Sequence, residues 1–356
     1  MSSRRNAVPT NNGHASHGRR DLLKAGAAML AAPLLAGVST DIQARTPNEK
    51  KGSAMNEQGT NEFINGMADL FAHSTRTPIL RRPDEYGMAY EDVHFPAMDG
   101  ITLEGWFIPA DSDRLVICNH CLPANRYGFP GHLEPWKSLG FGDFEVNFLP
   151  KYKALHDAGY NVLAYDLRNH GRSSAGSGGL VGHGTLEYRD VIGSLRYAKL
   201  RPDTKNMKTA LLSVCLGANS TIVAMHKHPD EFAHVRTLLA LQPVTAGLFV
   251  EVAMERAAIP DGTARFEQAL YQRTGLHLKE LWPMEFAKSV TVPTMVAQVR
   301  SDFTIRPELI EEIYGHISAT DKKLYWIEGT DQRFEGYNHF GREPQAMLEW
   351  FNSHMS

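Results

Sequence analysis

Short apolar stretches alternate with amphipathic stretches along the chain, from about residue 90 to the C-terminus. The apolar stretches have the length and composition of buried β-strands, and the amphipathic ones repeat apolar side chains at the helical period. Before them, two strand-like runs flank Asp99-Gly100, a strong signal for a β-hairpin turn. The predicted buried strands are 114–120, 160–168, 208–215, 236–244, 291–299 and 322–329, and the predicted helices are 148–159, 185–202, 216–228, 307–317 and 344–355. A hairpin followed by strands that alternate with helices predicts an α/β fold with a mostly parallel, doubly wound sheet.

Two segments depart from this alternation. Residues 245–290 are rich in helix-forming and apolar residues, so we expect a helical cap inserted over the C-terminal edge of the sheet. Residues 45–89 precede the alternation and read as a polar linker followed by a helical extension. The main domain then covers residues 90–355, with the cap inside it.

The first 44 residues have the features of a bacterial export signal. GRRDLLK (18–24) resembles a twin-arginine signal, and the apolar run at 25–38 follows it. That run has about 14 residues, too few to span a bilayer and typical of a signal-peptide core. With cleavage after Ala44, we expect export by the twin-arginine translocase to the periplasm of a Gram-negative bacterium, without a membrane span in the mature chain.

Composition narrows the class of partner. The chain has 356 residues, of which 42% are hydrophobic, and a formal net charge of −3. This charge gives no reason to expect a nucleic-acid partner. The His and Cys positions lack the spacing of a structural zinc site, so no metal or other cofactor is expected. The chain has three cysteines, an odd number, so at least one should stay free in an oxidising compartment.

One of these cysteines stands in a distinctive setting. Residues 213–217 read Ser-Val-Cys-Leu-Gly and lie between a predicted strand and a predicted helix. Small residues two positions before and two positions after a nucleophile allow the sharp strand-to-helix turn called the nucleophile elbow. The dipole of the following helix favours a thiolate at Cys215. Cys215 is therefore the candidate nucleophile, in the place where serine is usual.

The elbow, together with residues 166–174, makes the chain resemble the α/β-hydrolase superfamily. Residues 166–174 are similar to the D-x-R-G-H-G-x-S loop of that superfamily, with Asn169 in place of a glycine, and we expect that loop to be structural. Within the superfamily, a cysteine nucleophile resembles the dienelactone hydrolase branch, which uses a Cys-His-Asp triad without a cofactor. The cap and the export signal depart from that branch.

The resemblance implies roles for residues that follow the nucleophile. The superfamily order is nucleophile, acid and histidine. Asp302 directly follows the predicted strand 291–299 and is expected to orient the base, and His339, between the last strand and the last helix, is expected to take the thiol proton. Asp331 and Glu335 are the competing acids. Other histidines are expected in loops or around the pocket: His120, His170 and His183.

The resemblance also implies an oxyanion hole. Residues 119–122 resemble the His-Gly-X turn of the superfamily, with Cys121 in place of the glycine. The backbone N–H of Leu216, with that of Cys121 or Leu122, is expected to bind the developing oxyanion. Cys118 and Cys121 form a C-x-x-C spacing, but an extended strand end would hold these thiols too far apart for a disulfide. Cys121 faces the elbow, so a reversible Cys121–Cys215 disulfide is an open hypothesis.

The predicted function is hydrolysis of a small-molecule ester, lactone or thioester through a thioester on Cys215. Two alternatives stay open: acyl transfer from the same intermediate, and a binding or redox-sensing protein in which the thiol reports oxidation. A second small-x-Ser-x-small match, at Ser177, lacks a strand before it and a helix after it and is set aside. Large apolar residues of the cap either bind an apolar acyl group or pack the cap onto the body: Phe249, Met254, Phe266, Tyr271 and Trp282.

Overall fold

The computed structural model describes residues 55–281 and 284–356, so the predicted export signal lies outside the described residues. The strands are β1 (Glu91–Pro96), β2 (Thr102–Ile108), β3 (Arg114–Asn119), β4 (Gly128–Phe129), β5 (Val146–Asn147), β6 (Asn161–Tyr165), β7 (Lys208–Val214), β8 (Val235–Leu241), β9 (Thr294–Val299) and β10 (Lys322–Ile327). The helices are α3 (Glu57–Ala72), α4 (Leu149–Asp157), α5 (Tyr188–Leu200), α6 (Leu216–Lys227), α7 (Ala246–Arg256), α8 (Gly262–Thr274), α9 (Pro307–His316), α10 (Arg333–Gly336), α11 (His339–Arg342) and α12 (Gln345–Met355). Short 3₁₀ helices lie at Pro83–Tyr86, Lys137–Leu139, Ser177–Gly179, Pro229–Phe232, Leu278–Glu280 and Met284–Ser289.

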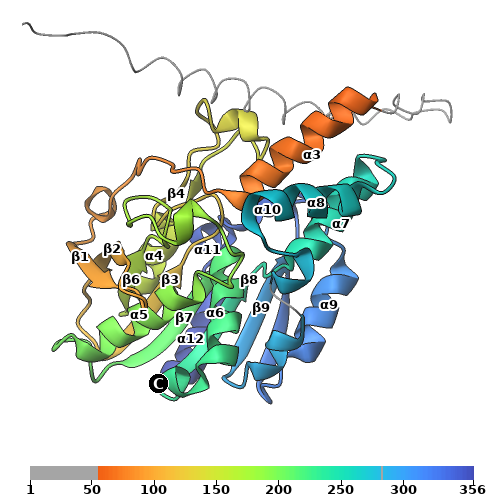
Figure 1. The fold of residues 1–356 in the computed structure, drawn as a ribbon. Helices are drawn as coiled ribbons and strands as arrows, with labels where there is room; N and C mark the ends of the chain where they lie inside the picture. Colours follow the sequence, from red (N-terminus) through yellow and green to blue (C-terminus); the bar gives the residue numbers. More distant parts are fainter. Residues whose placement is uncertain (1–54, 282–283) are drawn as a thin grey trace, which may run out of the picture.

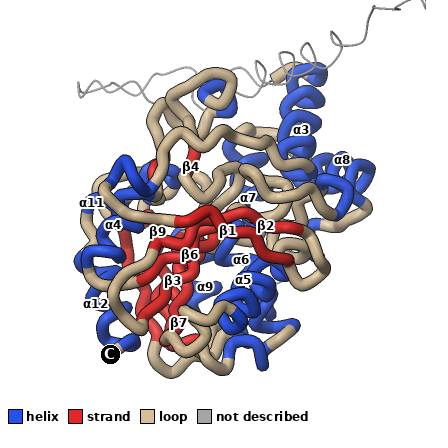
Figure 2. Tube along the Cα trace, turned by 90° about the vertical axis from the view of Figure 1, so that its left-hand side faces the viewer, coloured by secondary structure: helices blue, strands red, loops and turns tan. Residues whose placement is uncertain are grey.

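Eight strands form one twisted sheet in the order β1-β2-β6-β3-β7-β8-β9-β10 (Figures 1 and 2). β2 pairs antiparallel with both β1 and β6, and the remaining neighbours pair parallel. The β1–β2 hairpin turns at Asp99-Gly100, where Gly100 has φ of +86°. The predicted mostly parallel, doubly wound sheet is therefore confirmed. The carboxyl ends of its central strands meet at one edge, where α/β folds place their ligands.

Helices cover both faces of the sheet, because the central strands are buried on both sides. One apolar core packs the sheet against α5, α6 and α9, and a second core packs it against α4, α11 and α12. In Figure 1, α5, α6 and α9 lie in front of the sheet, and α12 lies behind it. This layering fixes the direction in which each strand delivers its final residues.

The segment between β8 and β9 folds into α7, α8 and two short 3₁₀ helices, which form the predicted helical cap at the carboxyl end of the sheet. The N-terminal helix α3 packs along α8 (Figure 1). Phe63, Met67 and Phe71 of α3 are buried at successive helical turns and join a third apolar core with the cap. The cap and α3 thus form one helical layer over the sheet edge.

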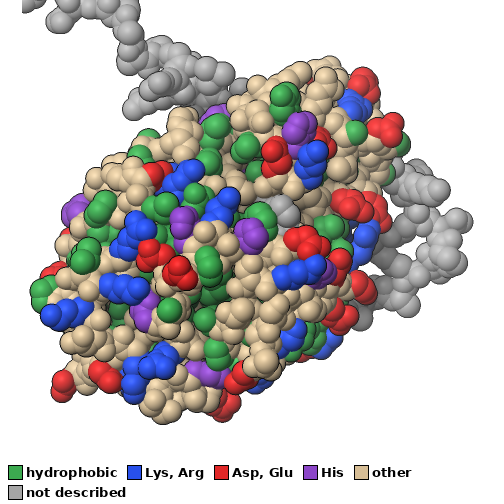
Figure 3. Space-filling view, turned by 60° about the horizontal axis from the view of Figure 1, so that its bottom comes forward, with side chains coloured by type: hydrophobic (Ala, Val, Ile, Leu, Met, Phe, Trp, Pro, Cys, Tyr) green, Lys and Arg blue, Asp and Glu red, His purple; other side chains and the backbone are tan. Residues whose placement is uncertain are grey.

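Charges on the exposed surface are mixed. On the face drawn in Figure 3, basic and acidic side chains are interspersed rather than gathered by sign. No helix among residues 55–281 and 284–356 has the length and the apolar character that crossing a membrane requires.

Candidate active site

Cys215 occupies the junction between β7 and α6 in a conformation that few residues adopt. Its φ is 48° and its ψ is −104°, outside the regions where a side chain is unstrained. Strain of this kind costs about 1–3 kcal/mol and persists at functional sites where the surrounding structure holds it. Cys215 donates its backbone N–H to Leu241 of β8, and its carbonyl accepts from Asn219 inside α6. The backbone geometry is that of the predicted nucleophile elbow.

Gly217 shows why the elbow needs a small residue. A Cβ at this position would lie 2.5 Å from the carbonyl oxygen of Asn119, at the end of β3. The N–H of Gly217 donates to the carbonyl of His120 at 3.0 Å, which ties the elbow to the loop after β3. Ser213, the other small residue, is fully buried, and its Oγ accepts from the Asn119 amide at 2.8 Å.

Two side chains of the segment after β10, Arg333 and Tyr337, line the same pocket as the Cys215 thiol, and both lie close enough to it to interact electrostatically. Arg333 Nε donates to the Tyr337 hydroxyl at 3.0 Å, and Arg333 Nη2 donates to the carbonyl of Gln242 after β8. Burial lowers the pKa of Arg333, but Tyr337, Cys215 and Asp302 around it outweigh burial and raise that pKa. The guanidinium is thus a fixed positive charge beside the sulfur.

Asp302 lies where the sequence predicted, directly after β9, but its partner is not an imidazole. Arg333 Nη1 donates to Asp302 Oδ2 at 2.8 Å, and both side chains are at most 3% exposed. Gln298 Nε2 and the backbone and hydroxyl of Thr304 also donate to this carboxylate, at 2.7–2.9 Å. The carboxylate therefore orients Arg333 and, through it, faces Cys215.

His339 lies elsewhere. It begins α11, and its Nε2 lies 3.1 Å from the Tyr325 hydroxyl of β10, while its ring packs against Tyr325 and Phe340. His339 does not line the pocket that contains Cys215, and burial lowers the pKa of its ring. The structure thus brings Cys215 and Asp302 together around Arg333 and does not bring His339 to them.

The physical reason is the path of the chain after β10. Arg333 lies closer to the end of that strand than His339, and α10 turns Arg333 and Tyr337 over the sheet edge. The chain then continues to the face covered by α12, which carries His339 away from the edge. Asp331 and Glu335, the competing acids, make no contact with Asp302 or Cys215 among the interactions of the described residues. Arg333 was missed because an arginine cannot act as a base, so residue chemistry alone gave no signal for it.

The predicted oxyanion residues surround the elbow. Leu216 is the first residue of α6, where a backbone N–H has no partner within the helix, and its side chain lines the pocket together with Leu122. Cys121 is fully buried instead, and its carbonyl accepts from His120 Nδ1 at 2.8 Å. His120 Nε2 accepts from the N–H of Leu167 at 2.9 Å, which fixes the His120 tautomer and anchors the loop. Leu216 and Leu122 therefore line the pocket, whereas Cys121 does not.

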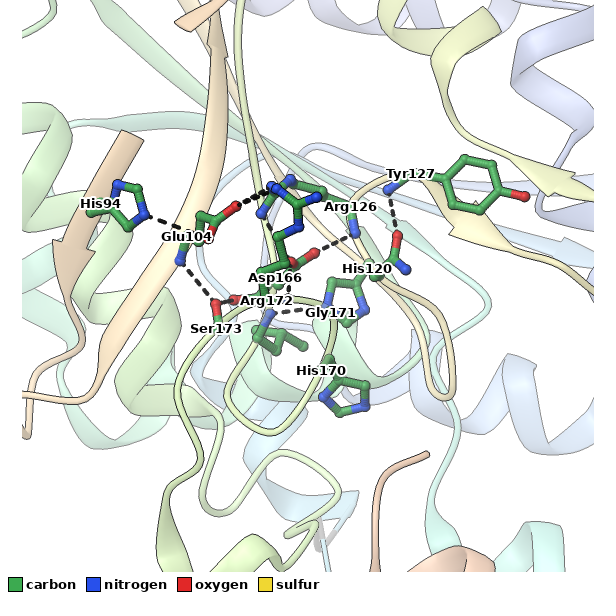
Figure 4. A network of polar contacts seen from close by, with 12 residues as sticks. His94, Glu104, His120, Arg126, Tyr127, Asp166, His170, Gly171, Arg172 and Ser173 are labelled. Atoms are coloured by element: carbon green, nitrogen blue, oxygen red, sulfur yellow. Dashed lines mark hydrogen bonds and ion pairs between the residues drawn. The ribbon is translucent and has the colours of Figure 1, made fainter. Parts of the chain in front are cut away.

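A buried polar network joins the loop after β3 to residues 166–174 (Figure 4). Asp166, after β6, accepts from the backbone N–H and Nη1 of Arg126 at 2.7 and 2.9 Å, and from the N–H of Arg172. Arg126 Nη2 in turn donates to Glu104 of β2 at 2.6 Å. The loop 166–174 thus has the structural role that its sequence predicted, and no residue of it lines the pocket.

The pocket above Cys215 is mainly apolar. Its floor consists of the elbow, Arg333 and Tyr337, and its walls come from the cap, from α3 and from the segment before β5. Representative wall residues are Met67, Leu70, Phe71, Phe141, Phe249 and Val252. Besides Cys215, Arg333 and Tyr337, the ionisable lining residues are Arg256 at the rim and His183, whose Nε2 lies 3.0 Å from the Phe71 carbonyl.

The large apolar residues of the cap divide between two roles. Phe249 lines the pocket, whereas Met254 and Phe266 are buried against α3. Tyr271 is 48% exposed, and Trp282 lies outside the described residues. The cap therefore contributes some apolar side chains to the pocket and others to packing against α3.

No protein-family model and no curated protein sequence matches the chain. Solved structures do match its shape. The Pyrococcus furiosus esterase Pf2001 is similar over 80% of this chain and 100% of its own, with a TM-score of 0.59 and 20% identity. The α/β hydrolase GrgF from Penicillium sp. sh18 is similar over 75% of this chain and 99% of its own, with a TM-score of 0.51 and 18% identity. A hypothetical protein, PA2218 from Pseudomonas aeruginosa, has a TM-score of 0.54 and 12% identity, over 75% of this chain and 94% of its own.

Sequence identities of 12–20% support a similarity of fold only. The strand order, the elbow between β7 and α6, and these neighbours agree with one another. The chain therefore has the α/β-hydrolase fold, with an inserted helical cap.

Proposed function

We propose that the chain cleaves an ester or thioester bond of a small apolar acyl compound, through a thioester formed on Cys215. The observation that carries this proposal is the strained backbone of Cys215 at the floor of an apolar pocket. An inert structural thiol would gain nothing from a conformation that costs about 1–3 kcal/mol. The esterase among the structural neighbours is compatible with this reading.

The first half of the reaction follows from the groups around the sulfur. The Cys215 thiolate attacks the acyl carbon, and the electrons of the carbonyl bond move to the carbonyl oxygen. The backbone N–H of Leu216 donates a hydrogen bond to this oxyanion. Arg333 stabilises the thiolate by its charge before the attack. When the intermediate collapses, the bond to the leaving group breaks, and the leaving oxygen or sulfur takes a proton from water. Burial holds the pKa of Tyr337 well above its usual range, so the hydroxyl stays protonated and serves as a hydrogen-bond donor.

The role of the base differs from the one that the sequence predicted. Arg333 fills the space between Cys215 and Asp302, where a triad would place its histidine. Because a guanidinium stays protonated, Arg333 cannot remove a proton from water. We therefore assign Arg333 and Asp302 to positioning and charge stabilisation. His339 stays a candidate base only through a rearrangement that frees it from Tyr325.

Acyl transfer is the second candidate, and one observation favours it. Arg333 and Tyr337 lie beside Cys215 in the pocket, and neither is suited to activate water for hydrolysis of the thioester. A stronger nucleophile, such as an amine or a thiol, would attack the same intermediate without a base. Added acceptors should then raise the yield of acylated product above that of free acid.

The experiment uses p-nitrophenyl esters of increasing acyl length with the full chain, and follows both p-nitrophenol release and intact mass. We expect an acyl adduct on Cys215 in the wild type and none in Cys215→Ala. Arg333→His places an imidazole between the thiol and Asp302, so the adduct should form and then turn over faster. His339→Ala is the matched control and should behave as the wild type. A wild type that forms no adduct at Cys215 would overturn the proposal, and equal losses in His339→Ala and Cys215→Ala would return the base to His339.

We further propose that the chain is exported through the twin-arginine translocase to the periplasm. The proposal rests on GRRDLLK (18–24), the apolar run after it and the cleavage site expected after Ala44 in DIQA (41–44). Cell fractionation tests it: replacing Arg19 and Arg20 by lysine should retain the protein in the cytoplasm. A periplasmic protein that tolerates both replacements would contradict it.

A further inference from the structure

Cys121 and Cys215 occupy equivalent places on neighbouring strands. β3 and β7 pair parallel with Asn119 opposite Ser213, and each cysteine follows two residues later. The hydrogen bond from the N–H of Gly217 to the carbonyl of His120 keeps the two chain segments together beyond the last pair. The register therefore brings the two cysteine backbones side by side.

This spacing suits a disulfide. Neighbouring strands lie about 4.8 Å apart, and a disulfide joins Cα atoms that are about 4.4–6.8 Å apart. The third cysteine does not share this placement. Cys118 lies opposite Leu212, three residues before Cys215, which offsets it by about 10 Å along the strand direction. Cys118 is thus a natural control within the same chain.

The two thiols differ in access and in surroundings. Cys215 lines the pocket, where the guanidinium of Arg333 lies beside it. Cys121 is fully buried, and both burial and the neighbouring Cys215 raise its pKa. An oxidant in the pocket therefore meets Cys215 first, and Cys121 is available to Cys215 but shielded from solvent. All three thiols are free in the structure.

We propose that Cys215 and Cys121 form a hydroperoxide-reducing dithiol pair that closes into a reversible disulfide. The Cys215 thiolate attacks one peroxide oxygen and the O–O bond breaks. The sulfur becomes sulfenic acid, and the peroxide is reduced to an alcohol or water as its second oxygen takes a proton. The Cys121 sulfur then attacks the sulfenic sulfur, an S–S bond forms, and the hydroxyl leaves as water with the Cys121 proton. A dithiol reductant reopens the pair.

The consequence for acyl chemistry is direct. The disulfide removes the nucleophile, so oxidation switches off ester cleavage and also protects Cys215 from irreversible oxidation. The apolar wall of the pocket, with Phe71, Phe141 and Phe249, favours an organic hydroperoxide over hydrogen peroxide.

The test measures sulfur chemistry by mass, so it stands apart from the test of ester cleavage. The full chain is reduced, freed of reductant and treated with one equivalent of either cumene hydroperoxide or hydrogen peroxide. We expect a loss of two hydrogens, a Cys121–Cys215 cross-link in the peptide map, and return to the reduced mass with dithiothreitol. Cumene hydroperoxide should react faster. If hydrogen peroxide reacts equally fast, the preference for an organic hydroperoxide is overturned.

Variants separate the pair from simple oxidation. Cys118→Ala should form the cross-link as the wild type does, and Cys215→Ser should stay unoxidised. Cys121→Ser should gain one oxygen that dimedone traps, then further oxygens; Cys121→Ala checks this result if the first variant folds poorly, with circular dichroism as the measure of folding. A wild type that gains oxygen without losing hydrogen, or a cross-link that needs Cys118, would overturn the proposal.

Discussion

The floor and the walls of the pocket are built by different means. The floor consists of residues fixed by the sheet: Cys215 follows β7, Asp302 follows β9, and Arg333 lies between them in a buried ion pair with Asp302. The walls come from α3 and the cap, whose apolar side chains pack against one another outside the sheet. Polar groups at the floor are fixed by direction, through hydrogen bonds, whereas the walls are held by apolar contact area. Substitutions at the floor should therefore strongly reduce activity or stability. Substitutions at the walls should have smaller effects and mainly change which substrates bind.

The largest effect is expected at the floor, from loss of the nucleophile. Cys215→Ala should lower the rate of ester cleavage by about 10³-fold or more, the scale seen when a covalent nucleophile is removed. Stopped-flow or steady-state kinetics with p-nitrophenyl esters measures this. Cys118→Ala, a buried thiol outside the pocket, should keep the wild-type rate. If the two variants lose activity equally, the floor does not act through Cys215.

The second effect concerns the ion pair of the floor. Arg333→Met leaves the buried carboxylate of Asp302 without its partner, so the free energy of unfolding should fall by about 3–5 kcal/mol. Urea denaturation measures it. The double variant Arg333→Met with Asp302→Asn removes the uncompensated charge and should regain part of the loss. A single variant as stable as the wild type would show that the pair does not hold the floor.

The third effect is a loss of stability in acid, centred on the loop that faces the floor. Burial lowers the pKa of His120 to about 4 and that of His170 to about 3. Below the ordinary histidine pKa, the unfolded chain binds protons that the folded chain rejects. The contribution of these histidines to the free energy of unfolding is therefore complete above pH about 6.5. Below that pH it falls by about 1.4 kcal/mol for each pH unit and each such histidine.

The structure shows where the loss of stability at low pH should originate. A proton on His120 Nε2 would replace the lone pair that accepts from Leu167. Urea titrations at pH 7, 6 and 5 measure the slope. His120→Asn should flatten it relative to the wild type, and an unchanged slope would place the acid sensitivity elsewhere.

The smallest effect is expected at the walls. Leu70→Ala on α3 removes a pocket-lining, half-buried side chain, so the KM for long-chain esters should rise about tenfold at most, at about 0.8 kcal/mol for each CH₂ no longer covered. The kcat for the acetyl ester should stay the same. Gln58→Ala, exposed on the same helix, is the control. If acyl length makes no difference in Leu70→Ala, α3 does not form part of the binding surface.

The fold and one half of the pocket floor could be predicted from the sequence. Periodicity and the turn at Asp99-Gly100 predicted the sheet, and the small residues around Cys215 predicted the elbow, because strand length and steric crowding are local properties. The position of Asp302 after β9 was also predictable, since parallel strands deliver their final residues to one edge.

The other half of the floor was hidden from the sequence. His339 fitted the expected residue type and order, but the path after β10 depends on packing against α12, which no local pattern reveals. Arg333 has the wrong chemistry for a base, so only its contacts identify it. Likewise α3 reads as an extension before the domain, and only its packing against α8 shows that it lines the pocket.

The arginine between Cys215 and Asp302 also bears on how such a site can evolve. A single amino-acid substitution, Arg333→His, separates the present site from a Cys-His-Asp set of residues. The buried carboxylate of Asp302 would serve either side chain, as the partner of a guanidinium or of an imidazole. The same scaffold thus lies one mutational step from a different division of labour between charge stabilisation and proton transfer.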